Sequence, residues 1–112
     1  MQPEAKVTKK IREFLTAHGV FVFKVHGGPT MMAGLPDLIA CVDGAFVGIE
    51  VKMPGNKPAL RQLYVHRKIE AAGGEVIVAY GVSDVEHLVS DDRGNTPAAP
   101  RKSLRKPAGG QE

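Results

Sequence analysis

Residues 34–52 read GLPDLIACVDGAFVGIEVK, in which Asp43-Gly44 separates two apolar runs at 38–42 and 45–51. An Asp-Gly pair between apolar runs is a strong signal for a two-residue hairpin turn. If these two residues form the turn, counting outward along the antiparallel ladder places Asp37 opposite Glu50. Because a one-residue bulge would shift this register, the facing pair is a hypothesis about the hairpin.

The facing pair would give this hairpin an unusual chemistry. Directly paired side chains share one face of the sheet, and Lys52, two residues beyond Glu50, joins that face. The remaining strand positions are mostly apolar, which predicts a hairpin covered on both faces, where uncompensated charge is costly. A divalent cation between the carboxylates would remove their repulsion, since Mg²⁺ prefers oxygen ligands. Such a cation beside a lysine ammonium predicts metal-dependent phosphodiester hydrolysis.

Each half of this pattern is weak evidence when taken alone. A Pro-Asp pair commonly opens a strand, and a Glu-x-Lys triplet commonly lies on a solvated sheet face. Their combination across one turn, inside apolar strands, favours the functional interpretation. Cys41, the single cysteine, excludes an internal disulfide and indicates a reducing cytoplasm. Its position within a strand predicts a small buried hydrophobe.

Length and charge indicate one domain followed by a basic tail. The chain has 112 residues, 43% of them hydrophobic, which suffices for one compact core. Residues 93–112 hold five basic side chains against one acidic, whereas residues 1–92 hold 10 basic and 11 acidic. We therefore expect a domain at 1–90 and a disordered Pro-, Ala- and Gly-rich tail at 91–112. The tail either adds salt-sensitive attraction to nucleic acid or is a solvated terminus.

Targeting signals are not evident in the sequence. It contains no apolar run of membrane-spanning length and no segment resembling a signal peptide. We therefore expect no membrane association and a cytoplasmic location.

Apolar periodicity predicts seven elements. We expect a helix at 3–18, a strand at 20–25, the hairpin strands within 37–52, a helix at 59–72 and a strand at 75–80. The sequence Ser83-Asp84-Val85-Glu86 has the form of a capping box, which should open a last helix reaching about Val89. The order α-β-β-β-α-β-α predicts a mixed sheet with a right-handed crossover between its third and fourth strands.

The helix at 59–72 carries further candidate residues. Gln62 and His66 are four residues apart and share a face. They could reach the active-site end or a DNA phosphate, or they could belong to a solvated polar stripe. Lys24, Arg61 and His66 are the candidate DNA contacts. No histidine has zinc-ligand spacing, and neither a Walker loop nor a G-x-S-x-G sequence is present.

The motifs together resemble a known family. The pattern G-x-P-D at 34–37, E-x-K at 50–52 and a helix glutamine at 62 resembles the VRR-NUC (virus-type replication-repair nuclease) domain of the PD-(D/E)xK nuclease superfamily. The resemblance extends from about Glu4 to Val89. It implies an α/β, restriction-endonuclease-like α-β-β-β-α-β core with a mixed sheet flanked by helices.

The resemblance also implies roles for individual residues. Asp37, Glu50 and the backbone carbonyl of Val51 would bind Mg²⁺ or Mn²⁺, and Glu4 matches an acidic residue of the N-terminal helix near the metal. Lys52 would orient or activate the attacking water and stabilise developing charge. Gln62 would be the catalytic glutamine of the helix.

The implied activity is cleavage of branched DNA. Small stand-alone members are typical of bacteriophage-related genomes, so the resemblance implies a bacterial or phage-infected cell. Such members are expected to act as homodimers on structures such as Holliday junctions, whereas copies fused to repair enzymes act as monomers on flaps. A flap or nick nuclease is therefore one alternative. A non-catalytic DNA-binding or scaffold module is another, and the net charge of −1 over residues 1–92 gives it some weight.

Overall fold

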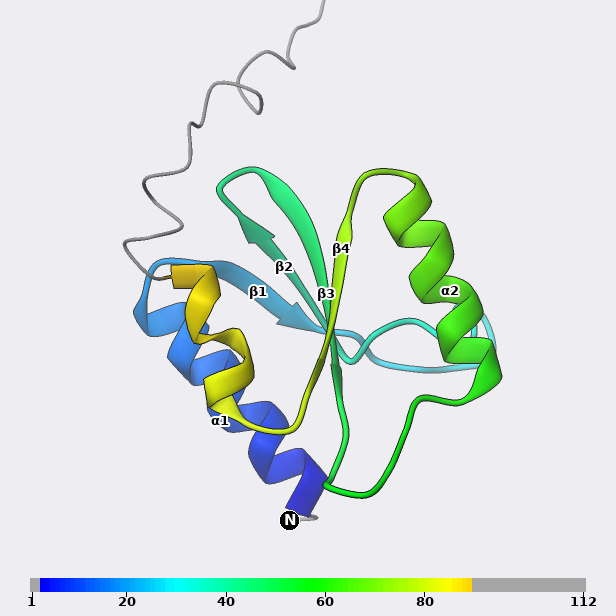
Figure 1. Cartoon of the computed structure of the whole chain (residues 1–112), viewed down its shortest axis with the longest axis horizontal. Helices are drawn as coiled ribbons and strands as arrows, with labels where there is room; N and C mark the ends of the chain where they lie inside the picture. Colours follow the sequence, from blue (N-terminus) through cyan, green and yellow to red (C-terminus); the bar gives the residue numbers. More distant parts are fainter. Residues whose placement is uncertain (1–2, 90–112) are drawn as a thin grey trace, which may run out of the picture.

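The computed structural model describes residues 3–89, and the predicted tail at 91–112 lies outside them. Its elements follow the predicted order (Figure 1). They are α1 (Pro3–Ala17), β1 (Phe21–Lys24), β2 (Leu38–Val42), β3 (Ala45–Val51), α2 (Leu60–Ala71), β4 (Glu75–Ala79) and the 3₁₀ helix η1 (Val82–Val89).

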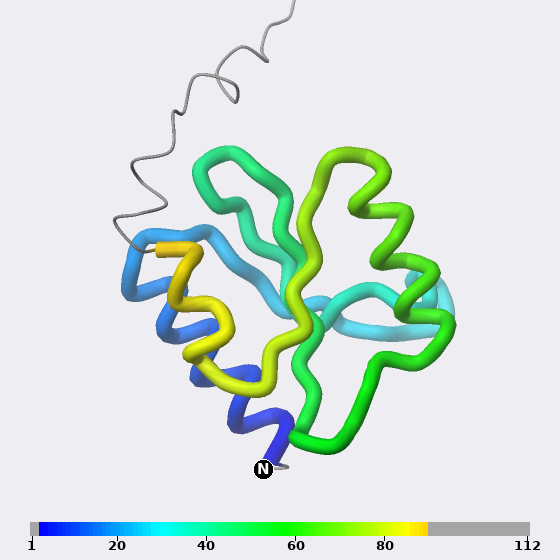
Figure 2. Tube along the Cα trace, in the orientation of Figure 1, coloured from blue at the N-terminus to red at the C-terminus, as the bar shows by residue number. Residues whose placement is uncertain are grey.

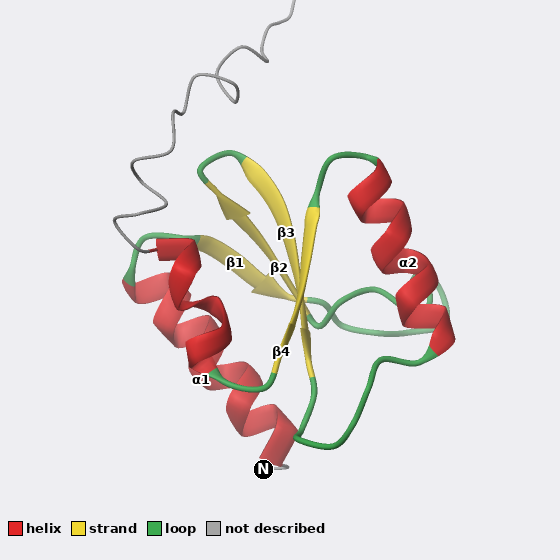
Figure 3. Ribbon diagram, in the orientation of Figure 1, coloured by secondary structure: helices red, strands yellow, loops and turns green. Residues whose placement is uncertain are grey.

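The four strands form one mixed sheet in the order β1-β2-β3-β4. The β1–β2 and β2–β3 pairs are antiparallel, and β3 and β4 are parallel. Helix α2 supplies the crossover between the parallel strands, as Figure 3 shows. The predicted fold class, a mixed sheet flanked by helices, is confirmed.

The hairpin has the predicted register. Asp43 and Gly44 both have positive φ, at 54° and 86°, as a two-residue hairpin turn requires. Val42 pairs with Ala45, and the ladder runs without a bulge to Leu38 opposite Ile49. Asp37 precedes Leu38 and Glu50 follows Ile49, so the two acids occupy the next facing positions.

Helices cover the two faces of the sheet unequally. On one face α1 and η1 enclose the main core (Figure 2), which contains Ile11, Leu15, Leu38, Ala40, Val42, Val47, Ile49, Val51, Ala79, Val85 and Leu88. On the other face α2 packs closely over β3. A Cβ at Gly48 would lie 3.8 Å from Ile69 Cδ1 of α2, an ordinary van der Waals contact, and 2.7 Å from Pro36 Cγ, so glycine is needed here to make room for Pro36.

The α2 face is open over β1 and β2, which corrects the predicted cover on both faces. Phe21 is 69% exposed, Phe23 46% and Phe46 47%. Cys41 is also exposed, so the prediction that it is buried was wrong. The physical reason is that one 12-residue helix is the only element on this face among residues 3–89, and it lies over β3 and β4.

The final helix also differs from its prediction. It is a 3₁₀ helix that begins at Val82, so Ser83 lies inside it and does not cap it. Asp84 has a turn-closing role instead, because its Oδ2 accepts a 2.7 Å hydrogen bond from the Tyr80 N–H. Within residues 3–89, no helix combines the length and apolar character needed to cross a membrane.

Candidate active site

Glu50 is the buried centre of the candidate site. It lies near the end of β3 on the face that α2 covers, and it is 1% exposed. Its Oε2 accepts a 2.8 Å hydrogen bond from Gln62 Nε2, and its Oε1 lies 3.2 Å from His66 Nε2. The Gln62 Oε1 in turn accepts a 2.8 Å hydrogen bond from the Ala59 N–H, which orients the amide. Both carboxylate oxygens are therefore held by the first half of α2.

Asp37 accepts hydrogen bonds from the residue that follows β1 and from the last residue of β3. Its backbone carbonyl accepts a 2.9 Å hydrogen bond from the Val25 N–H. Its Oδ2 accepts a 2.8 Å hydrogen bond from the Val51 N–H, so the side chain continues the contact between β2 and β3 beyond the last ladder pair. Asp37 is half-buried, and its carboxylate is held beside Glu50 by the Val51 N–H.

The two carboxyl groups strongly influence each other. Burial raises the pKa of Glu50 from 4.5 to about 8, and the charge of Asp37 and a hydrogen bond between the two side chains add to the increase. The Lys52 ammonium opposes this change in pKa, whereas the Glu4 charge adds to it. Two carboxylates in this position are not both ionised at neutral pH unless positive charge is supplied.

This donor set fits a hard divalent cation. Mg²⁺ and Mn²⁺ prefer oxygen ligands, and a cation beside the pair would relieve the repulsion that raises the Glu50 pKa. Residues 3–89 contain no group of three or more His, Cys, Asp or Glu side chains placed to hold a metal ion. The predicted metal site does not require three such side chains, because its third protein ligand is the backbone carbonyl of Val51.

Lys52 and Glu4 lie at the same end of the sheet as the acids. Lys52 is half-buried, its N–H donates to the Ala79 carbonyl at 3.0 Å, and its charge acts on the pKa of Glu50. Glu4 is exposed in the first turn of α1, which begins beside the chain leaving β3 in Figure 1. The structure therefore gathers Asp37, Glu50, Lys52, Gln62 and Glu4 at one location.

His66 belongs to this cluster and not to a DNA-facing surface. It is 5% exposed, and burial is the largest cause lowering its pKa below the usual 6.5. The interpretation that it contacts a DNA phosphate is therefore contradicted, and the alternative, that it reaches the active-site end, matches the geometry. Lys24 and Arg61 are exposed, and their DNA contacts stay predictions.

We made no prediction for Tyr64 from the sequence. It is 50% exposed, with the Arg61 guanidinium 5.4 Å and the Lys68 ammonium 5.2 Å from its ring centre. The spacing of Arg61 and Lys68 three residues before and four residues after the tyrosine would have predicted these cation–ring contacts.

Known structures share this architecture. A solved VRR_NUC domain is 28% identical with a TM-score of 0.67, covering 80% of this chain and 96% of that one. Hjc from Archaeoglobus fulgidus, described as a Holliday junction resolvase, is 20% identical with a TM-score of 0.54, covering 67% of this chain and 65% of its own. No protein-family profile and no curated protein matches the sequence. The predicted resemblance to a VRR-NUC domain is therefore confirmed for the part of this chain that the structure describes.

Proposed function

We propose that this protein is a Mg²⁺- or Mn²⁺-dependent endonuclease that hydrolyses phosphodiester bonds in branched DNA, with Holliday-junction-like structures as its main substrate. The observation that carries the proposal is the buried contact between Glu50 and Asp37, with Lys52 on the same face. Similarity to a VRR_NUC domain supports the proposed hydrolysis of phosphodiester bonds. Similarity of fold to a Holliday junction resolvase supports the substrate class.

The cation would be held by Asp37, Glu50 and the Val51 carbonyl, with Glu4 nearby. Bound Mg²⁺ or Mn²⁺ supplies positive charge to the phosphate oxygens and lowers the pKa of a coordinated water. Gln62 and His66 fix the Glu50 carboxylate from the α2 side, and the Val51 N–H fixes Asp37 from β3. These contacts hold the acids in place before substrate arrives.

Lys52 supplies the ammonium group of the proposed site. Its ammonium can donate a hydrogen bond to the attacking water or to a non-bridging phosphate oxygen. Water attacks phosphorus in line with the 3′ oxygen and releases a proton to solvent as its O–P bond forms. The P–O3′ bond breaks and the leaving 3′ oxygen takes a proton from solvent, so the products are a 5′-phosphate and a 3′-hydroxyl. Positioning and charge stabilisation provide most of the rate enhancement in such reactions.

The proposed active form is a homodimer. A four-way junction needs two symmetric cuts, and a two-fold dimer presents two identical sites to it. A monomer would suit a flap or a nick, which is the alternative substrate class.

A cleavage assay with matched variants tests the proposal. Labelled four-way junction, flap, nicked and linear DNA are incubated with the protein and either Mn²⁺ or EDTA. The wild type should cut the junction only with Mn²⁺, and Asp37→Asn should not cut it. Glu13→Gln is the matched control, because the Glu13 carboxylate is 63% exposed on α1 and should be dispensable. Full junction cleavage by Asp37→Asn with the metal present would overturn the assignment.

The non-catalytic alternative predicts a different result. A DNA-binding or scaffold module would bind DNA, cut none of the four substrates, and show no Mn²⁺ binding by calorimetry with or without DNA. Preferred cutting of flap or nicked DNA would keep the chemistry and replace the junction as substrate.

A further inference from the structure

A cavity lies inside the loop that leads from β1 to Asp37. We call residues 26–36 the site loop and this hollow the loop cavity. Its volume is about 280 Å³, and it is lined by Val25, by residues 27 and 28 and by residues 31–37. Asp37, a proposed metal ligand, is the only ionisable residue among them. The loop cavity therefore lies directly beside the position proposed for the scissile phosphate.

The site loop is fixed at two points, so the cavity does not depend on a ligand to form. At the base of the loop the Val25 N–H donates to the Asp37 carbonyl at 2.9 Å, which holds the two ends together. Gly34 has a φ of +89° and lies against α2, since a Cβ there would be 2.8 Å from the Arg61 carbonyl oxygen. The hollow between these two points is part of the fold.

Main-chain groups provide most of the polar atoms around the loop cavity. Apart from Asp37, the residues that line it are Gly, Ala, Val, Leu, Pro and Met, whose side chains carry no nitrogen or oxygen. Within the site loop the Met31 N–H donates to the Gly28 carbonyl at 3.1 Å. The N–H groups of Gly27, Gly28 and Gly34 have no main-chain partner among residues 3–89. Such donors and acceptors are available to a polar ligand.

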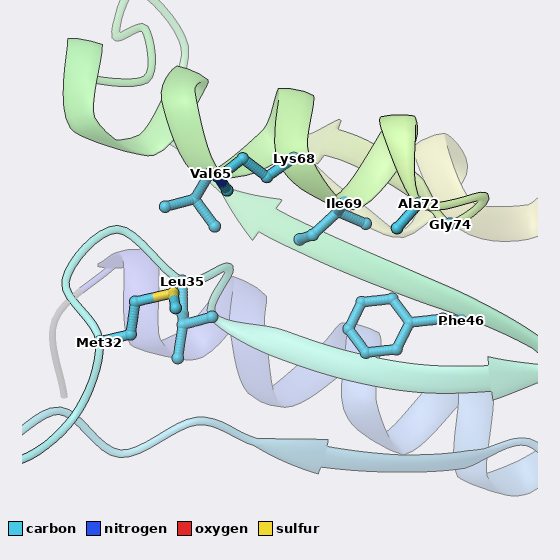
Figure 4. Close-up of a pocket in the computed structure, with 8 residues that line it drawn as sticks. All are labelled: Met32, Leu35, Phe46, Val65, Lys68, Ile69, Ala72 and Gly74. Carbon is cyan, nitrogen blue, oxygen red and sulfur yellow. The ribbon is translucent and has the colours of Figure 1, made fainter.

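Two methionines give the loop cavity an apolar side. Met31 is 45% exposed and Met32 is 61% exposed, and both line the cavity. Met32 and Leu35 also line the apolar groove under α2, where Figure 4 shows them on the opposite side from Val65. Thioether side chains are flexible and polarizable, and they pack favourably against aromatic rings. The lining therefore suits a planar ring with polar edges.

Charge and position decide which ligand fits the loop cavity. Its only ionisable side chain is acidic and no cation lines it, so the lining does not favour a phosphate. A phosphodiester held at Asp37 would carry a sugar and a base on each side. A base is planar and uncharged, with hydrogen-bond donors and acceptors on its edges. The volume equals that of about nine water molecules at roughly 30 Å³ each, which is enough for one base.

We propose that the loop cavity binds one unpaired base of branched DNA, next to the phosphate held at Asp37. In a continuous duplex every base is paired and stacked, and its extrusion costs free energy; the cost is smallest for a base that is already unpaired. The inference rests on the proposed nuclease function and names the feature of branched DNA that the site recognises.

Filling the loop cavity tests the proposal. Gly28 lines the cavity, its φ is not positive, and a Cβ there would meet no atom within 4 Å, so Gly28→Leu should fold and occupy the space of the base. It should slow junction cleavage with Mn²⁺ about tenfold, as expected for the loss of one stacked base. Ala17→Leu is the matched control, because it adds a leucine at the exposed last residue of α1 and should cut at the wild-type rate.

Abasic junctions distinguish a lost base contact from a general defect. The wild-type cut is mapped, and separate junctions then lack the base on one or the other side of the scissile phosphate. At one of these positions the wild type should slow about tenfold. Gly28→Leu should slow no further there, because its cavity is already blocked. Slowing of Gly28→Leu by both abasic sites as strongly as of the wild type would contradict the proposal.

A fluorescence measurement on the wild type serves if circular dichroism shows that Gly28→Leu is unfolded. The fluorescent base 2-aminopurine is placed at each of the two positions, in EDTA, at a protein concentration that shifts all of the junction in a gel. Entry of the base into the cavity should raise its emission several-fold at one position, because it leaves the stack. Unchanged emission at both positions would reject the base site.

The outcomes separate the loop cavity from the enzyme. A wild type that cuts none of the DNAs would reject the proposed function and this inference with it. Junction cleavage by folded Gly28→Leu at the wild-type rate would reject the loop cavity alone and leave the nuclease standing.

Discussion

Replacing Glu50 with glutamine should stabilise the metal-free protein in alkaline solution, although it removes a residue of the proposed active site. The buried Glu50 has a pKa raised from 4.5 to about 8, mainly by burial and the Asp37 charge. One pKa unit corresponds to about 1.4 kcal/mol, so ionising Glu50 in the folded state lowers the free energy of unfolding by on the order of 5 kcal/mol. That is a large fraction of the 5–15 kcal/mol typical of a domain. A neutral glutamine avoids this loss.

The raised pKa of Glu50 determines whether stability rises or falls with pH, and over which pH range it changes. Between pH 4.5 and about 8 the unfolded chain has released the Glu50 proton while the folded protein retains it, so stability falls as pH rises. His66 has the opposite effect below its usual pKa of 6.5, because its lowered pKa makes the folded protein bind fewer protons there. The range from pH 6.5 to 9 therefore isolates Glu50. Across it the wild type should lose about 2 kcal/mol more than Glu50→Gln.

Urea unfolding followed by circular dichroism measures this difference. Both proteins are unfolded at pH 6.5, 7.5, 8.2 and 9.0 in EDTA, and the free energies are compared at each pH. The wild type is then repeated with Mn²⁺ at pH 8.2, where binding to the ionised pair should raise its stability more than that of Glu50→Gln.

Glu13→Gln is again the control, because removal of an exposed carboxylate should leave the pH slope unchanged. Parallel pH profiles for the wild type and Glu50→Gln would refute the reasoning. They would mean that Glu50 is already ionised at pH 6.5, and that the facing acids do not need a cation.

Three further predictions concern neighbouring residues. Lys52→Met should lower the rate of junction cutting by about 100-fold or more while leaving junction binding, measured by gel shift, nearly unchanged. Gln62→Ala should cost about 1–3 kcal/mol in urea unfolding and weaken Mn²⁺ binding by calorimetry, because Glu50 Oε2 and the Ala59 N–H both lose their partner. Gly34→Ala should cost more stability than Gly55→Ala in thermal unfolding. Both glycines have φ near +90°, but only a Cβ at Gly34 would clash, at 2.8 Å from the Arg61 carbonyl oxygen in the first turn of α2.

The hairpin could be predicted because its determinants are local. Asp43-Gly44 favours positive φ at two consecutive positions, and that turn sets the register of every following pair. Alternation along the strands then places Asp37, Glu50 and Lys52 on one face without any information from the rest of the chain. The family motif added Gln62 to the same site.

The surroundings of that site depend on long-range packing. Where α2 lies on the sheet is set by contacts such as Ile69 against Gly48, which are 21 residues apart in sequence, and no periodicity within the helix encodes them. That placement buries His66 against Glu50 and leaves Phe21 and Cys41 uncovered. The strands and their facing acids therefore follow from neighbouring residues in the chain, whereas the lateral position of one helix determines the electrostatics of the acids and the exposed apolar surface.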